Sequence, residues 1–183
     1  MGRSHREPSL AGKTITLSIH IDADIETVWR ALVSPQAGDT WRIAHFKTDW
    51  RLGDSFEIEA PIGSKTYRDK GRVIRVEQPS LLQYSYWSRI AKLPDVAESR
   101  SIITIRLAAE GRQTTLQLEQ RVPATPSLGG QSREIGEDSG AKHWEFYWRA
   151  SLAMLKRVAE ESRPGQTRGD AGAAGALDDG GDG

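Results

Sequence analysis

One stretch of the chain, Lys142 to Glu161 (KHWEFYWRASLAMLKRVAEE), has the only long, uninterrupted helical pattern. One face of this predicted helix is apolar or small, and the opposite face is charged, as expected for a helix that packs on a core. The apolar face comprises Trp144, Trp148, Ser151, Leu152, Leu155, Val158 and Ala159. Four aromatic residues fall within its first turns: Trp144, Phe146, Tyr147 and Trp148. A helix cannot point all four in one direction, so something besides a single sheet layer must contact the N-terminal end of this helix.

Most of the chain before this helix alternates between apolar and polar residues, which predicts half-buried strands. The predicted strands are Thr14–Ile21, Ser55–Ala60, Lys65–Gln78, Leu81–Ser88, Ser99–Ala109 and Thr114–Val122. Asp24 is a natural N-cap for a helix that Pro35 would stop, and a second short helix or turn is expected over 36–41. Gly71 predicts a bulge or a close approach to the backbone, and 61–64 predicts a turn.

Composition narrows the classes of function. The 25 Lys and Arg balance the 25 Asp and Glu, so no net field would recruit nucleic acid or an anionic membrane. There is no Cys, which excludes disulfides and thiolate sites. No apolar leader or membrane-spanning window is present, so we expect a cytoplasmic protein. Residues 1–13 predict a flexible leader, 14–162 a single domain, and 163–183 a disordered Gly/Ala/Asp tail.

Titratable residues offer little support for a metal, a cofactor or a catalytic triad. His143 and Glu145 lie two apart on a helix and diverge by about 200°, so they cannot share a ligand. His45 lies near Asp49 in the sequence, but no metal-binding motif surrounds them. Glu57, Glu59 and Asp69 have the spacing of solvated strand residues. We therefore predict no metal, no cofactor and no catalytic residue from the sequence.

Four stretches of the sequence resemble the START-like (SRPBCC, helix-grip) superfamily, in the branch of the activator of the ninety-kilodalton heat-shock chaperone's ATPase. They are 21–32 (IDADIETVWRAL), 48–56 (TDWRLGDSF), 71–79 (GRVIRVEQP), and Trp148 with Leu152, Leu155 and Lys156. The resemblance implies an α+β fold of order β-α-α-β-β-β-β-β-β-α, in which a curved antiparallel sheet grips the C-terminal helix around a cavity. Many relatives have a His where this chain has Gln120, and a Gly where it has Tyr147. We expect the bulkier Tyr147 to narrow or reshape the pocket and to set which molecules fit.

The candidate ligand-binding residues lie on the inward faces of this arrangement. Each aromatic residue alone is most simply explained as core, but so many converging on one helix end suggest a partly wet pocket with hydrogen-bonding groups. Gln120 points inward by alternation and needs a partner, which we expect to be a Tyr hydroxyl or a ligand. The candidates are Trp41, Phe56, Tyr67, Tyr84, Tyr86, Ser101, Ile103, Gln120, Trp144, Tyr147 and Trp148.

Three functions are compatible with these residues. The first is a module that binds a small hydrophobic or aromatic molecule between the sheet and the last helix, with the loop 123–139 as a lid or binding loop. The second, which rests on the resemblance alone, is a co-chaperone-like domain with a chaperone or another protein as its partner. The third is a cyclase or dehydratase in which Tyr84, Tyr86 or Gln120 polarises a carbonyl, the phenols acting as hydrogen-bond donors.

Overall fold

The computed structural model describes residues 12–35, 39, 41–42, 44–62, 64–89, 93–123 and 139–163. Apart from Gly12, Lys13 and Arg163, the predicted leader and tail lie outside these residues. The same holds for the interior of the predicted lid, 124–138, and for most of the predicted second helix, in which only Asp39 and Trp41 are described and have helical backbone.

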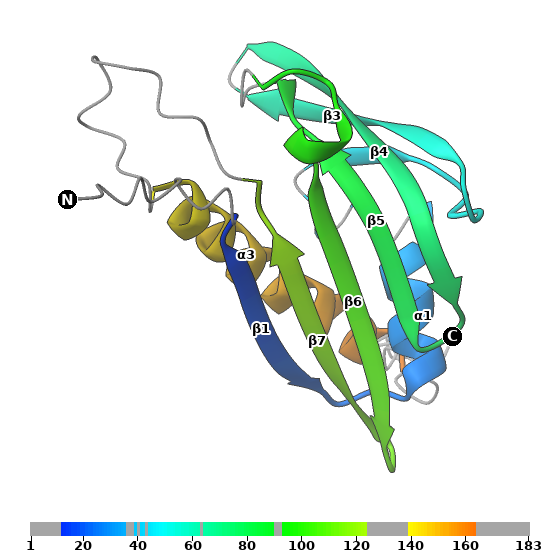
Figure 1. The fold of residues 1–183 in the computed structure, drawn as a ribbon. Helices are drawn as coiled ribbons and strands as arrows, with labels where there is room; N and C mark the ends of the chain where they lie inside the picture. Colours follow the sequence, from blue (N-terminus) through cyan, green and yellow to red (C-terminus); the bar gives the residue numbers. More distant parts are fainter. Residues whose placement is uncertain are drawn as a thin grey trace, which may run out of the picture.

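The described chain is α+β, as predicted, and its sheet is antiparallel throughout. Seven strands occur in the order β1-β7-β6-β5-β4-β3-β2, which places the first strand at one edge and the second at the other. The sheet curves, and α3 crosses its concave side, which is the helix-grip arrangement (Figure 1). The strands are β1 Thr14–Ile21, β2 His45–Lys47, β3 Ser55–Ile62, β4 Lys65–Glu77, β5 Leu81–Trp87, β6 Ser101–Glu110 and β7 Gln113–Arg121.

Two α-helices, α1 (Ile25–Val33) and α3 (Ser139–Glu161), cover the same side of the sheet (Figure 1). Asp24 caps α1 as predicted, because its Oδ1 accepts a hydrogen bond of 2.9 Å from the backbone N–H of Thr27. The helix ends at Val33, two residues before Pro35. The apolar face predicted for the last helix is also confirmed, since Leu152, Leu155 and Ala159 are almost fully buried. These faces and the inner face of the sheet form one core.

Gly71 on β4 is the position where a side chain approaches the backbone closely. It pairs with Phe56 of β3, and a Cβ at Gly71 would lie only 2.2 Å from the Phe56 ring. The second of the two expectations for this glycine is therefore confirmed. The irregularity in the pairing of β4 with β5 falls instead between Val73 and Arg75.

Several strand boundaries differ by one or two residues from the predicted ones. β3 continues through Pro61 and Ile62 before its turn, because both residues still pair with β4. β6 begins at Ser101, since Ala97–Ser99 forms a short 3-10 helix, η2, ahead of it. The hairpin from β6 to β7 is a two-residue turn in which Gly111 takes a positive φ of 64°, which glycine adopts without strain.

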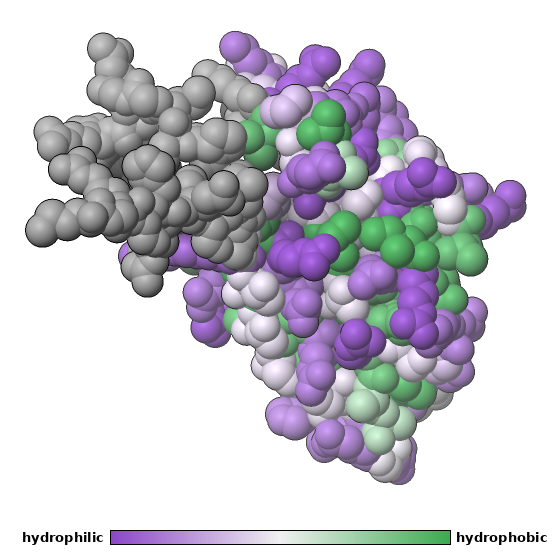
Figure 2. Space-filling model, viewed as in Figure 1, coloured by the Kyte–Doolittle hydropathy of each residue, from purple (hydrophilic) through white to green (hydrophobic). Residues whose placement is uncertain are grey.

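The outer face of the sheet is largely hydrophilic (Figure 2). Arg72, Arg106, Gln117 and Glu119 alternate with the inward residues of their strands and are exposed. A band of hydrophobic residues also crosses the visible face (Figure 2). Successive side chains along a strand point to opposite faces of the sheet. These polar residues therefore face outward because their neighbours in the strand face inward.

Candidate functional site

The helix α3 has two halves of different character. Its C-terminal half contributes Leu152, Leu155 and Ala159, which pack as aliphatic core with exposed fractions of 0–1 %. Its N-terminal half contributes Trp144, Tyr147 and Trp148, whose rings meet edge to face at 5.6 and 5.2 Å between centroids. Each of these rings has a polar atom as well as a large apolar surface. The candidate site is therefore the volume between this aromatic half and the sheet.

Gln120 on β7 is fully buried and is held between α3 and β6. Its Oε1 accepts a 2.5 Å hydrogen bond from the indole Nε1 of Trp148, and its Nε2 donates to Ser101 Oγ at 3.3 Å. The predicted inward orientation of Gln120 is confirmed, as is that of Ser101. Our prediction that its partner is a Tyr hydroxyl or a ligand was wrong, because Trp148 and Ser101 supply both contacts. This amide joins the helix to the sheet.

Tyr86 on β5 faces the aromatic half of α3 and shares a buried hydrogen bond with Asp69 of β4. Its hydroxyl donates to Asp69 Oδ2 at 2.5 Å, and its ring meets Trp144 edge to face at 5.4 Å. Asp69 Oδ1 also accepts from the backbone N–H of Arg89 at 2.9 Å. Asp69 is only 1 % exposed, so our interpretation of it as a solvated residue was wrong. Strand alternation indicates the inward orientation of Asp69, since Asp69 shares a face of β4 with Gly71 and Val73.

A second aromatic cluster lies on the β2 side of the sheet. It consists of Phe46, Trp50, Phe56 and Tyr84, with ring centroids 5.3–6.0 Å apart. The indoles of Trp50 and Trp41 donate to the carbonyls of Val33 and Ala31, at 3.1 and 3.0 Å. These carbonyls belong to the last turn of α1, where no partner exists within the helix. Trp41 therefore closes the end of α1.

Arg42 lies between α1 and the second cluster, and sequence analysis missed it. Its Nη2 donates to the carbonyl oxygen of Leu32. Its guanidinium carbon lies 4.2 Å from the ring centroid of Trp41, 4.8 Å from that of Phe46 and 5.2 Å from that of Trp50. Burial lowers the pKa of Arg42 to about 10, which leaves the group charged at neutral pH. No periodic pattern runs through this part of the sequence, so nothing there indicated an inward cation.

Three of the four tyrosines are buried deeply enough to change their ionisation. Burial raises the pKa of Tyr84, and the Arg42 guanidinium partly offsets this. Burial also raises the pKa of Tyr86, and the hydrogen bond to Asp69 adds to the effect. Burial raises the pKa of Tyr147, against the smaller influences of Ser151 and Arg42. At neutral pH these phenols are hydrogen-bond donors and not bases.

The predicted site residues thus form two groups, with three residues outside them. Tyr86, Ser101, Gln120, Trp144, Tyr147 and Trp148 meet at the aromatic half of α3. Phe56 and Tyr84 belong to the second cluster, and Ile103 pairs with both Tyr84 and Gln120 and so lies between the two groups. Tyr67 is half-buried on β4, two residues before Asp69, and Trp41 lies under α1.

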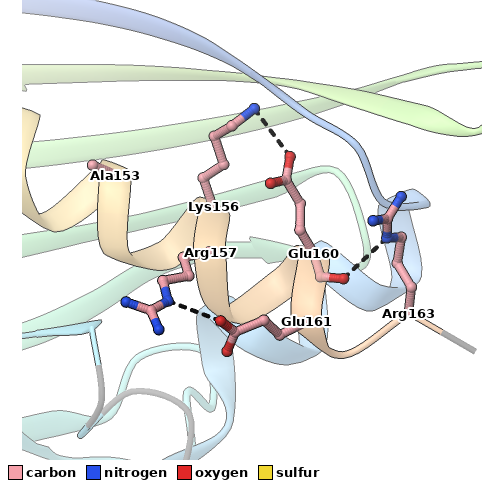
Figure 3. A pocket seen from close by; sticks show the side chains of 6 residues that line it. All are labelled: Ala153, Lys156, Arg157, Glu160, Glu161 and Arg163. Carbon is pink, nitrogen blue, oxygen red and sulfur yellow. Dashed lines mark hydrogen bonds and ion pairs between the residues drawn. The ribbon is translucent and has the colours of Figure 1, made fainter. Parts of the chain in front are cut away.

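A surface hollow of about 280 Å³ lies elsewhere, along the C-terminal half of α3 (Figure 3). Lys156 pairs with Glu160 there, and Arg157 pairs with Glu161, so the charged groups already have partners (Figure 3). None of the predicted site residues lines it. Its lining residues are Ala153, Lys156, Arg157, Glu160, Glu161 and Arg163.

Within the described ranges, no three His, Asp or Glu side chains are grouped as a metal ion would require. His45 contacts Asp39, at 3.0 Å, and not its sequence neighbour Asp49. His143 is exposed. No helix in the described part of the chain is both long and apolar enough to cross a membrane.

Comparison with known proteins identifies the family. The family model described as "Activator of Hsp90 ATPase homolog 1-like protein" matches residues 22–160, which include α1, the sheet from β2 to β7 and nearly all of α3. The chain belongs to this family. The START-like resemblance inferred from the four sequence stretches is thereby confirmed. No curated protein matches the chain significantly.

Solved structures of this type have the same fold. A Cytophaga hutchinsonii protein is 28 % identical, with a TM-score of 0.63, over 82 % of this chain and 96 % of that one. A Chromobacterium violaceum protein is 24 % identical, with a TM-score of 0.61, over 80 % of this chain and 96 % of that one. An AHSA1-like protein from Aeromonas hydrophila is 21 % identical, with a TM-score of 0.57, over 81 % of this chain and 92 % of that one.

Proposed function

We propose that this protein binds a small hydrophobic or aromatic molecule between the sheet and the N-terminal half of α3. The observation that carries the proposal is the asymmetry of α3. Its C-terminal half is closed aliphatic core, whereas its N-terminal half presents the half-buried Trp144 and Tyr147 to Tyr86. A purely structural interface would favour aliphatic side chains, which leave no polar atom to satisfy.

A buried hydroxyl in the same region supports this proposal. Ser151 Oγ is buried and has no hydrogen bond of ordinary geometry, and Tyr147, one helical turn earlier, lies close enough for the two hydroxyls to interact. It lies on the face of α3 that meets the sheet. A bound molecule with a hydrogen-bonding group would give this hydroxyl a well-placed partner beside the aromatic rings.

The test is titration with phenylnaphthylamine, an uncharged aromatic dye that fluoresces in apolar surroundings. We expect saturable uptake of one dye per folded chain, and at least tenfold weaker binding by Trp144→Ala. The matched control is Trp87→Ala, because Trp87 is half-buried on the outer face of β5. Near-ultraviolet circular dichroism checks that each variant keeps fixed packing. Absence of saturable uptake by the wild-type protein would refute the proposal.

A second candidate is a protein-interaction function like that of the activator for which the family is named. The observation in its favour is Phe146, which is 75 % exposed on α3. A large exposed aromatic residue is a common anchor of protein interfaces. A pull-down with the heat-shock chaperone, with an assay of its ATPase rate, tests this candidate. Phe146→Ala should abolish any effect, and failure of the wild-type protein to bind would exclude the chaperone.

A further inference from the structure

The outer face of α3 carries a projecting aromatic ring beside small side chains. Phe146 is 75 % exposed, and it lies nine residues before the fully buried Leu155, which places the two on opposite sides of the helix. Ala150 and Ala153 follow Phe146 on the same exposed face. The distance between two packed helices depends on the size of the side chains at their contact, so small residues allow a close approach. This face is therefore shaped for contact with another helix.

The surface hollow further along α3 has the form of a socket for one side chain. Four of its lining residues, Ala153, Lys156, Arg157 and Glu160, have the i, i+3, i+4, i+7 spacing of the hole that receives one side chain of a facing helix. Lys156 pairs with Glu160, and Arg157 with Glu161, so these side chains are held along the hollow (Figure 3). Its volume of about 280 Å³ exceeds that of a phenyl ring but is below the roughly 300–1,000 Å³ of pockets for drug-sized ligands.

The ring and the hollow lie on one face of the same helix, so an antiparallel second copy of α3 fits both. A two-fold axis that sets Ala150 of each copy level with Ala153 of the other brings the helices together at small residues. The same axis sets Phe146 level with Arg157 of the second copy, at the hollow, because both pairs are centred on the same point of the helix. Such a surface is complementary to itself, as a two-fold symmetric contact requires.

The charges at the two ends of α3 fit the antiparallel register. Lys142 and Glu161 are both exposed, and the same axis sets Lys142 of each copy level with Glu161 of the other. It also sets the exposed Arg149 level with Met154, which is uncharged. A parallel pairing would instead place Lys142 beside Lys142 and Glu161 beside Glu161. Opposite charges across the contact therefore favour the antiparallel arrangement.

We propose that the outer face of α3 docks antiparallel on α3 of a second copy of this chain, with Phe146 of each copy in the hollow of the other. The contact uses one helix from each copy, so we expect it to bury less than the roughly 1,200–2,000 Å² of stable interfaces. The dimer is accordingly weak and dissociates at the low concentrations used for unfolding measurements. It does not depend on ligand binding, which we place on the opposite face of α3.

Sedimentation equilibrium over a range from about 10 µM to 1 mM protein tests the proposal. The apparent mass should rise from that of one chain toward that of two. Phe146→Ala should weaken association at least tenfold, because a two-fold contact loses the ring twice. The matched control is Leu52→Ala: Leu52 is 70 % exposed in the turn before β3, so its removal should leave association unchanged. Association that is unchanged in Phe146→Ala would overturn the proposal.

A charge exchange tests the register. Lys142→Glu should weaken association by about threefold or more, since an attraction becomes a repulsion at both ends of the contact. The double variant Lys142→Glu/Glu161→Lys should restore it, because opposite charges again lie level. Near-ultraviolet circular dichroism checks that each variant stays folded. No recovery in the double variant would overturn the antiparallel register.

A wild-type protein that stays monomeric over the whole range would overturn the dimer and leave the proposed ligand binding standing, since that is measured separately by dye uptake. If such a monomer binds the heat-shock chaperone and Phe146→Ala does not, the partner of this ring is the chaperone and not a second copy. Failure of dye uptake with Phe146-dependent association would have the reverse meaning: the dimer stands and the ligand site falls.

Discussion

The indole N–H of Trp148 donates to the side-chain carbonyl of Gln120, and this 2.5 Å hydrogen bond joins the middle of α3 to β7 in the buried interior. It is a buried polar contact between the helix and the sheet. Ser101 completes it by accepting from the Gln120 amide. This amide therefore adds a buried polar link between α3 and the sheet to the aliphatic packing of Leu152, Leu155 and Ala159.

Gln120→Leu should lower the free energy of unfolding by about 1–3 kcal/mol, because it removes the acceptor of the Trp148 N–H while keeping the side-chain volume. Urea unfolding measures the change, and Gln117→Leu, which is exposed on the same strand, serves as the control. The double variant Gln120→Leu/Trp148→Phe should be less destabilised than the sum of the single variants. Additive effects would mean that the hydrogen bond contributes little.

Gly71→Ala should destabilise the protein by about 1–3 kcal/mol, since the new methyl group would overlap the Phe56 ring. Thermal or urea unfolding gives the magnitude. Shortening the opposing side chain provides the control: Phe56→Leu combined with Gly71→Ala should cost less than the two changes added together. If Gly71→Ala is neutral, the β3–β4 region is more adaptable than its packing indicates.

The three buried tyrosines predict loss of stability at alkaline pH. Their folded-state pKa values are raised, so their contribution is complete below the unfolded value of about 10 and falls as pH rises above it. Above about pH 10, each tyrosine should make the free energy of unfolding fall by about 1.4 kcal/mol more per pH unit. Arg42, with its pKa lowered to about 10, acts in the opposite direction. We therefore compare the wild-type protein with a variant and do not interpret the absolute slope.

Tyr84→Phe isolates one of these contributions, because it removes a single phenol and keeps the ring that packs on Trp50. Above about pH 10 its unfolding free energy should fall less steeply than that of the wild-type protein, by about 1.4 kcal/mol per pH unit. Urea midpoints measured across this range provide the comparison. Identical slopes would show that Tyr84 ionises in the folded protein as freely as in the unfolded one.

Much of the fold follows from the sequence because its strands and last helix bury one face each, which produces clear periodicity. The inward orientation of Gln120 and Ser101 followed from that alternation alone. Asp69 was wrongly interpreted as solvated, although its strand position places it on the inward face with Gly71 and Val73. The partner of Gln120 was not predictable, since it depends on how α3 crosses the sheet. Arg42 follows α1 outside any regular strand or helix, so no period marks its direction.

Tyr147 should control the space beside α3, because its ring lies against those of Trp144 and Trp148. Tyr147→Ala should lower the free energy of unfolding by about 2–4 kcal/mol, since it removes a half-buried ring that contacts Trp144 and Trp148. It should also tighten uptake of phenylnaphthylamine, because the dye can fill the volume that the ring leaves. The neighbouring Phe146→Ala is the control: its ring is 75 % exposed, so stability should change by less than about 0.5 kcal/mol and dye uptake should not change. Weaker dye uptake by Tyr147→Ala would show that this ring is a binding surface for the ligand and not a barrier to it.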